Sequence, residues 1–235
     1  LEVIVYTSTE SIVTGNALRN VPVFSALECQ LNEMPGPYCK SKLLAELEAL
    51  KAAEGGLPVV IVAPTLPVGP GDRSITPPTR MILDFLNVKT PAYLDCRFNM
   101  ADVRDIAQGH ILAAARGKPG ERYILGNENI TLSQLLMWVE EITGLLMPKK
   151  RIPYWLALIA AAVNEFVADY MTHKPPMAPL AGVRLARYPM HFDCSKAVND
   201  LGLPQNSVRQ AVADEIEWLL DNGLVMRRLP LLREI

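Results

Sequence analysis

Leu57-Pro58-Val59-Val60-Ile61-Val62 is a short apolar run rich in β-branched residues, and Ala63-Pro64 ends it. A run of this kind predicts a strand that is buried on both faces. The preceding residues 41–53 are strong helix formers, and Gly55-Gly56 stops the predicted helix. Residues 1–6 form an earlier apolar run of the same kind. Strand, helix and strand within about sixty residues indicate a βαβ unit, whose ligands bind at the carboxyl ends of its strands.

Tyr38 and Lys42 stand four residues apart at the beginning of that helical segment, in the sequence P-Y-C-K-S-K. Residues at this spacing share one helix face, so the phenol and the ammonium group can point into the same cleft. A phenol transfers protons poorly near pH 7 because its ordinary pKa is about 10, and a fixed cation close by lowers that pKa. A hydroxyl from the run Thr7-Ser8-Thr9, at the end of the first strand, can hold a substrate oxygen beside the phenol. These residues predict acid–base chemistry.

The composition is that of a globular protein, because 50% of its 235 residues are hydrophobic. The net charge is −2 with both signs interspersed, which favours neither nucleic acid nor an anionic membrane. We interpret the basic residues 149–151 as a solvated helix terminus. The most apolar stretch, residues 154–163, is shorter than the ~20 residues that cross a bilayer. We expect it to be a buried or substrate-covering helix, which leaves peripheral membrane contact open.

The four cysteines show neither C-x-x-C spacing nor a pairing with histidines. This pattern predicts free thiols in a reducing compartment, so we expect a cytoplasmic protein. Cys39 stands beside Tyr38, but adjacent helix positions point in different directions, and a packing role is favoured. The three histidines lack the spacing of metal ligands, so no metal site is expected.

Two carboxylates near these segments receive different interpretations. Asp105 precedes an apolar helix over residues 106–115 and is predicted to cap it rather than to act in catalysis. Glu10 directly follows Thr9. A solvent-facing loop carboxylate is favoured for Glu10 over a second acid–base group, which an epimerase or dehydratase would require. The pattern further predicts a strand over residues 121–125 and helices over residues 131–142, 196–201 and 208–220.

Seven motifs follow one another along the chain: Y-T-S-T-E (6–10), G-P-Y-C-K-S-K (36–42), V-V-I-V-A-P-T-L-P-V-G-P-G-D (59–72), P-A-Y-L-D (91–95), D-V-R-D-I-A-Q-G-H (102–110), G-E-R-Y-I-L-G-N-E-N (120–129) and G-V-R-L-A (182–186). In this order they resemble the extended short-chain dehydrogenases/reductases. The resemblance is to the NAD-dependent epimerase/dehydratase branch, with its dihydroflavonol-reductase-like proteins and hopanoid-associated sugar epimerases. It covers most of the chain and is more specific than one tyrosine–lysine pair.

The resemblance implies a doubly wound, parallel, Rossmann-like α/β sheet with a smaller α/β substrate-binding lobe. It implies that Tyr38 moves a proton to or from the substrate oxygen, while Lys42 lowers the pKa of Tyr38 and binds the nicotinamide ribose. Thr9 is favoured for the hydrogen bond to the reacting oxygen, and Ser8 stays open as its competitor. The contacts implied for NAD or NADP are Thr7, Ser8, Tyr38, Lys42, Pro64 and Thr65, with the last two against the nicotinamide.

The same resemblance divides the chain into two parts. Residues 1–64 and 96–127 would form the second half of the cofactor domain, and residues 65–95 and 128–235 the substrate lobe. Family members usually begin with a strand, a glycine-rich turn and a helix whose N-terminus holds the pyrophosphate. Gly69-Pro70-Gly71 does not match this turn, because it lacks the third glycine and has proline where a donor is needed. We therefore expect a sheet that is incomplete at its N-terminus and weak dinucleotide binding by this chain alone.

The implied function is an NAD(P)-dependent oxidoreductase that acts on a carbonyl or secondary alcohol of a small molecule. A sugar epimerase or dehydratase is the first alternative. A non-catalytic assembly subunit is the second; retention of the tyrosine, lysine and threonine argues against it, and the missing glycine-rich turn argues for it. A reductase of apolar carbonyl compounds is favoured by the apolar residues 154–163 and by Met171, Met177 and Met190. A homodimer is compatible with each alternative.

Overall fold

The computed structural model describes residues 2–13, 31, 34, 36–88, 91–167, 180–187 and 190–231. Cys29, Met171 and Met177 lie outside these ranges. The chain forms two compact units. The first contains Leu1–Gly69, Phe98–Asn129 and Met190–Ala211, and the second contains Pro70–Arg97, Ile130–Pro189 and Val212–Ile235.

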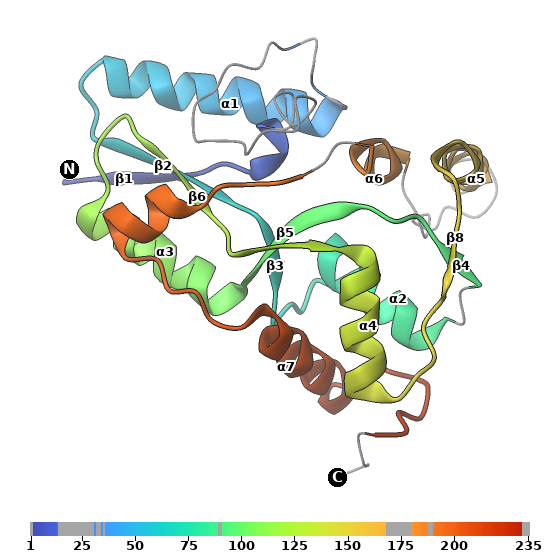
Figure 1. The fold of residues 1–235 in the computed structure, drawn as a ribbon. Coiled ribbons are helices and arrows are strands. Elements are labelled where there is room, and N and C mark those ends of the chain that lie inside the picture. Colours follow the sequence, from blue (N-terminus) through green and yellow to red (C-terminus); the bar gives the residue numbers. More distant parts are fainter. Residues whose placement is uncertain are drawn as a thin grey trace. The chain divides into compact units, whose positions relative to one another are not determined.

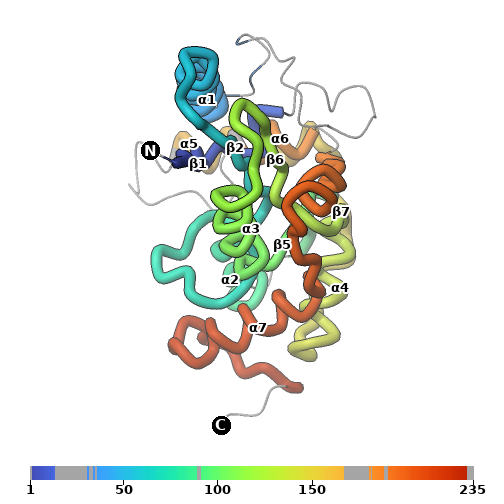
Figure 2. Tube along the Cα trace, turned by 90° about the vertical axis from the view of Figure 1, so that its left-hand side faces the viewer, coloured from blue at the N-terminus to red at the C-terminus, as the bar shows by residue number. Residues whose placement is uncertain are grey.

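The first unit is built on three parallel strands in the order β1-β2-β6 (Figure 1). Helices α1 and α3 cover opposite faces of this sheet (Figures 1 and 2). Parallel strands between helices confirm the predicted Rossmann-like α/β fold. The elements are β1 (Ile4–Thr7), α1 (Pro37–Glu54), β2 (Val59–Pro64), α3 (Val103–Arg116) and β6 (Arg122–Leu125).

The central strand β2 is buried as its continuous apolar sequence predicts. Every side chain from Val59 to Ala63 is at most 3% exposed. Helix α3 ends against this strand at Gly117. A Cβ there would lie 2.6 Å from Cγ1 of Val60 and 2.4 Å from the carbonyl oxygen of Ala113, so only glycine fits. The predicted helix between the first two strands is also confirmed, with Pro37 at its start and Gly55 after its last residue.

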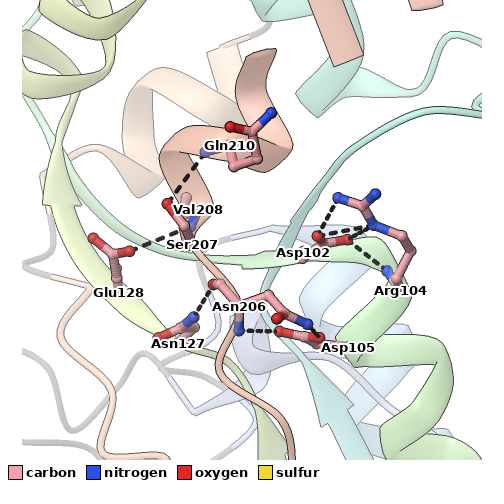
Figure 3. Close-up of polar contacts among 9 residues, drawn as sticks. All are labelled: Asp102, Arg104, Asp105, Asn127, Glu128, Asn206, Ser207, Val208 and Gln210. Carbon is pink, nitrogen blue, oxygen red and sulfur yellow. Dashed lines mark hydrogen bonds and ion pairs between the residues drawn. The ribbon is translucent and has the colours of Figure 1, made fainter. Parts of the chain in front are cut away.

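Helix α3 begins three residues earlier than predicted. Its N-cap is Asp102, whose Oδ1 accepts a hydrogen bond from the backbone N of Arg104 at 2.8 Å. The expectation that Asp105 caps this helix is wrong, since Asp105 already lies in its first turn. Asp105 is nevertheless structural. Its two carboxylate oxygens accept hydrogen bonds from the backbone and side-chain nitrogens of Asn206, at 2.7 and 2.6 Å (Figure 3).

These contacts attach residues 190–211 to the first unit. Asn206 also accepts a hydrogen bond on its carbonyl oxygen from Nδ2 of Asn127 at 2.7 Å (Figure 3). Leu201 and Leu203 are buried in one apolar cluster with side chains of β2 and β6. A short π-helical segment, Ala197–Leu201, stands where a helix over residues 196–201 was predicted.

A second sheet, in the order β3-β5-β7, contains β3 (Leu66–Val68), β5 (Arg97–Asp102) and β7 (Glu128–Thr131). The second unit holds α2 (Pro77–Asn87), α4 (Leu132–Thr143), α5 (Tyr154–Val167) and α6 (Leu180–Leu185), with β4 (Ala92–Tyr93) parallel to β8 (Lys150–Arg151). The final helix α7 (Val208–Asp221) contributes residues to both units.

The caps of α4 follow the sequence pattern closely. Thr131 is the N-cap, and its hydroxyl accepts a hydrogen bond from the backbone N of Gln134 at 3.1 Å. Gly144 ends the helix in the left-handed conformation, with φ of 74°. Over the described ranges of the chain, every helix is too short or too polar to span a bilayer.

Candidate active site

The side chains at the end of β1 point alternately to the two helices that cover the sheet. Thr7 is exposed and contacts His110 of α3, with 3.1 Å between its Oγ1 and the histidine Nε2. Nδ1 of His110 lies 2.8 Å from the carbonyl oxygen of Ile106, which can only accept a hydrogen bond. Nδ1 therefore carries a proton, and in the neutral imidazole Nε2 accepts from the Thr7 hydroxyl.

Ser8 points the other way, into a buried polar cluster. Its hydroxyl donates to Glu46 of α1, and the other oxygen of this carboxylate accepts from Arg122 of β6. The three residues are 4%, 0% and 5% exposed. Sequence reasoning missed Glu46 and Arg122, because a contact between residues 76 apart leaves no local pattern. Because the Ser8 hydroxyl donates its hydrogen bond to Glu46, it does not point to a ligand at the carboxyl end of β1.

Thr9 follows β1 and caps the 3-10 helix Glu10–Ile12. Its Oγ1 accepts a hydrogen bond from the backbone N of Ser11 at 3.3 Å and donates to Oε2 of Glu10 at 3.1 Å. Thr9 is half-buried, so a ligand can reach it. Among the candidate hydroxyls of Thr7, Ser8 and Thr9, that of Thr9 forms a hydrogen bond with a carboxylate of this 3-10 helix.

Glu10 is half-buried rather than solvent-facing, which corrects the expectation from sequence. Burial disfavours the charged carboxylate and raises the pKa of Glu10 from 4.5 to about 7. Hydrogen bonds from its own backbone N–H and from Thr9 offset part of this effect. A carboxyl group that titrates near neutral pH can both give and take a proton under physiological conditions.

The raised pKa of Glu10 predicts a pH-dependent stability. Between pH 4.5 and about 7 the folded protein binds more protons at this group than the unfolded chain does, so stability falls as pH rises through that window. We expect the melting temperature of the protein, relative to that of a Glu10→Gln variant, to decrease from pH 5 to pH 8. Thermal unfolding followed by circular dichroism measures both curves. Parallel curves for the two proteins would contradict the assignment.

Tyr38 and Lys42 lie in the first two turns of α1, on one face of the helix. Tyr38 is 59% exposed and Lys42 is half-buried, so both side chains are open to a ligand. Helix α1 packs on the 3-10 helix Glu10–Ile12, which Thr9 caps, and Cys39 in the first turn of α1 forms a hydrogen bond with Ser11. The fold thereby brings two sequence motifs, 6–10 and 36–42, together beyond the carboxyl end of β1.

Cys39 points into the protein beside these residues. It is 3% exposed, and burial raises the pKa of its thiol, with Glu10 adding to the shift and a hydrogen bond with Ser11 opposing it. Burial likewise raises the pKa of Cys96 and of Cys194 to about 12. All three are free thiols. The described cysteines are therefore poor nucleophiles, and the packing role expected for Cys39 is confirmed.

Pro64 and Thr65 lie at the carboxyl end of β2, next to β1 in the sheet. Thr65 is 2% exposed, and its hydroxyl donates to the carbonyl oxygen of Leu125 at 3.3 Å. Pro64 is half-buried. A ligand at this position would therefore contact the ring of Pro64. The hydrogen bond of Thr65 to Leu125 holds the end of the strand in place.

The residues present fit the nicotinamide end of a dinucleotide. Hydroxyl groups, an ammonium group and a proline ring stand at the carboxyl ends of β1 and β2, where this sheet architecture binds its ligands. The pyrophosphate end has no counterpart in Gly69-Pro70-Gly71. Gly69 and Gly71 have positive φ values of 139° and 103°, but α2 begins only at Pro77, so no helix N-terminus follows the turn directly. Clusters that could hold a metal ion are absent from the described residues.

Comparisons with known proteins agree with this arrangement. A dihydroflavonol 4-reductase by name, from Synechocystis sp., is 42% identical over 231 residues, which are 96% of this chain and 66% of that protein. Sterol demethylase protein B of Methylococcus capsulatus is 32% identical over 80% of this chain and 58% of its own length. The chain thus spans about three fifths to two thirds of these relatives.

Among solved structures, the crystal structure of gox2253 superposes with a TM-score of 0.80 at 34% identity, over 96% of this chain and 68% of that one. The family model for the NAD-dependent epimerase/dehydratase family matches residues 1–126, more than half of the sequence. Together with the parallel sheet and the motifs at its carboxyl edge, this match shows that the chain belongs to the NAD-dependent epimerase/dehydratase family.

Proposed function

We propose that this chain carries the catalytic face of an NAD(P)-dependent oxidoreductase that interconverts a carbonyl and a secondary alcohol. One observation carries the proposal. The hydroxyl-bearing turn after β1 packs against the beginning of α1, which presents an exposed tyrosine and a lysine four residues later. The bound dinucleotide would supply the hydride, and the chain's own side chains would handle the proton.

Each side chain has a role that its position supports. Tyr38, exposed at the start of α1, would exchange a proton with the substrate oxygen. Lys42, one turn further on the same face, would supply a positive charge beside the phenol and a hydrogen bond to the nicotinamide ribose. Thr9 would hold the substrate oxygen after its hydroxyl rotates from Glu10 to the substrate. The His110 contact would keep Thr7 fixed at the edge of the cofactor site.

An apolar substrate is supported by the names of the relatives. One is called a dihydroflavonol reductase and the other a sterol demethylase protein, and both names refer to polycyclic compounds rather than to sugar nucleotides. We therefore place a hydrophobic ketone or aldehyde in the site, with NAD or NADP as cofactor. The first unit would bind the cofactor, and the second would bind the substrate. The described cysteines are free thiols, which suits a reducing compartment, so the proposed location is the cytoplasm. A homodimer is compatible with this proposal.

Glu10 favours a second candidate function, a dehydratase or epimerase of the same family. These reactions need a further group that removes or returns a proton, and a carboxyl with a pKa of about 7 next to Thr9 meets that need. An epimerase reoxidises the cofactor that it reduces, so it shows no net consumption of NAD(P)H. This difference separates the two functions by experiment.

The test uses the purified full-length protein with NADH and with NADPH in separate reactions. We expect stoichiometric loss of the reduced cofactor when a hydrophobic ketone or aldehyde is added, because a reductase must exchange its cofactor in each cycle. Absorbance of the cofactor and chromatography of the product measure both sides of the reaction. Interconversion of nucleotide sugars without net oxidation would instead establish the epimerase. Inactivity in both assays, with the cofactor bound, would favour the non-catalytic subunit.

A further inference from the structure

Helix α5 lacks the polar face that a surface helix of a globular protein normally presents to solvent. From Tyr154 to Val163 it contains no charged residue. One side packs on α6, where Ala157 and Ala161 are buried against Val183 (Figure 1). Burial, one of the two alternatives expected from the sequence for residues 154–163, is therefore found on this side of the helix.

The opposite side of α5 exposes large apolar side chains to solvent. Trp155, Leu156, Ile159 and Val163 are 62%, 41%, 53% and 56% exposed. Three of them follow one another at intervals of four residues, and Leu156 is adjacent, so all four lie within about 100° of the helix circumference. We call these four residues the apolar strip. Contiguous exposed apolar surface of this kind marks an interaction site.

Exposed basic residues stand on the elements next to α5, although the whole chain has a net charge of −2. Lys150 lies on β8, shortly before α5, Arg184 lies on α6, which packs on α5, and Arg187 follows α6. The neighbouring Lys149 and Arg151 form ion pairs with Glu140 and Asp95. The net charge of the whole chain therefore hides the positive charge that Lys150, Arg184 and Arg187 place beside α5.

We propose that the apolar strip of α5 docks on the surface of an anionic lipid bilayer. An interfacial helix inserts its apolar side to the depth of the headgroups, and basic residues beside it bind anionic lipids. Trp155 next to Tyr154 at the start of α5 matches the preference of these two residue types for the membrane–water interface. The local positive charge and the uncharged stretch 154–163 of α5 are both needed for this mode of binding.

A second copy of the chain is a less suitable occupant. Four half-exposed side chains offer roughly a few hundred Å², whereas a stable interface buries about 800 Å² on each partner. Two copies that met at this surface would also bring their basic residues together, and like charges repel. A bilayer has neither disadvantage, since it needs no complementary shape and carries the opposite charge. The proposal goes beyond the proposed reaction and does not depend on it.

The experiment is sedimentation of the purified full-length protein with large vesicles, either of phosphatidylcholine alone or with about 30% phosphatidylglycerol. We expect sedimentation with the anionic vesicles that falls severalfold in 0.5 M salt, where charges are screened within a few ångströms. A Trp155→Ser/Ile159→Ser variant should bind at least about tenfold more weakly. A Lys150→Ser/Arg184→Ser variant should bind severalfold more weakly and lose most of the salt dependence.

Matched control variants distinguish binding by the apolar strip from nonspecific hydrophobic adsorption to vesicles. Leu146 and Met226 are 81% and 88% exposed elsewhere on the second unit, and their serine variants should bind like the unchanged protein. Tryptophan fluorescence should shift to the blue with anionic vesicles, and a Trp155→Phe variant should lose the shift while it still sediments. Equal sedimentation of all variants would overturn the proposal. So would a dimer in light scattering that the Trp155→Ser/Ile159→Ser variant converts to a monomer without any vesicle binding.

Discussion

Replacement of Tyr38 by phenylalanine should reduce the turnover number of the full-length enzyme by about 10²–10⁴-fold, the usual contribution of a positioned proton donor. The change deletes one hydroxyl from a side chain that is 59% exposed, so neither the core nor the helix depends on it. Cofactor affinity and melting temperature should stay nearly unchanged. Steady-state kinetics with the carbonyl substrate, together with cofactor titration, measure these quantities.

Tyr154→Phe is the matched control, because Tyr154 also stands in the first turn of a helix and the substitution removes the same atom. It should retain nearly full turnover. Lys42→Met should lower turnover as well, since it removes the charge beside the phenol. If Tyr38→Phe kept more than about a tenth of the activity, Tyr38 would not be the proton-transfer group.

Those parts of the fold that depend on local pattern could be read from the sequence. The continuous apolar run of β2, the helix between the first two strands and the caps Thr131 and Gly144 all follow from neighbouring residues. The cap of α3 could not be assigned in this way. Asp102 and Asp105 are equally good caps by composition, and the choice is made by the strand: Asp102 still pairs with Val68 of β3, so the helix starts directly after it.

In the candidate site, too, features set by local sequence could be predicted and features set by tertiary packing could not. Tyr38 and Lys42 are proposed from their spacing, and a hydroxyl group from its place after a strand. Within residues 7–9, the family resemblance favours Thr9. Whether a carboxylate beside them is solvated or buried depends on how α1 packs against the 3-10 helix, and no local pattern encodes that packing. For this reason the sequence suggested a solvent-facing Glu10, although the folded chain half-buries it and raises its pKa to about 7.

Arg122→Met should destabilise the protein by about 3–5 kcal/mol, the usual cost of removing one partner of a buried ion pair. The cost arises because Glu46 is 0% exposed, and its buried carboxylate would keep only the Ser8 hydroxyl as a described side-chain donor. For a chain of this size such a loss corresponds to roughly 10 °C in melting temperature. Urea unfolding followed by circular dichroism and by fluorescence measures it.

The double variant Glu46→Leu/Arg122→Met separates two causes of the lost stability. One is the cost of a buried charge without its partner, and the other is the loss of the attraction between the two charges. When both charges are replaced by apolar groups of similar volume, no charge has to be desolvated, so most of the lost stability should return. Glu48 and Lys51 on the same helix provide the control, since they form an exposed ion pair at 2.7 Å. Glu48→Gln should leave the unfolding midpoint unchanged, because solvent screens that pair. A double variant as unstable as Arg122→Met alone would show that the cluster stabilises the sheet through its attraction, and that the cost of an unpaired charge is minor.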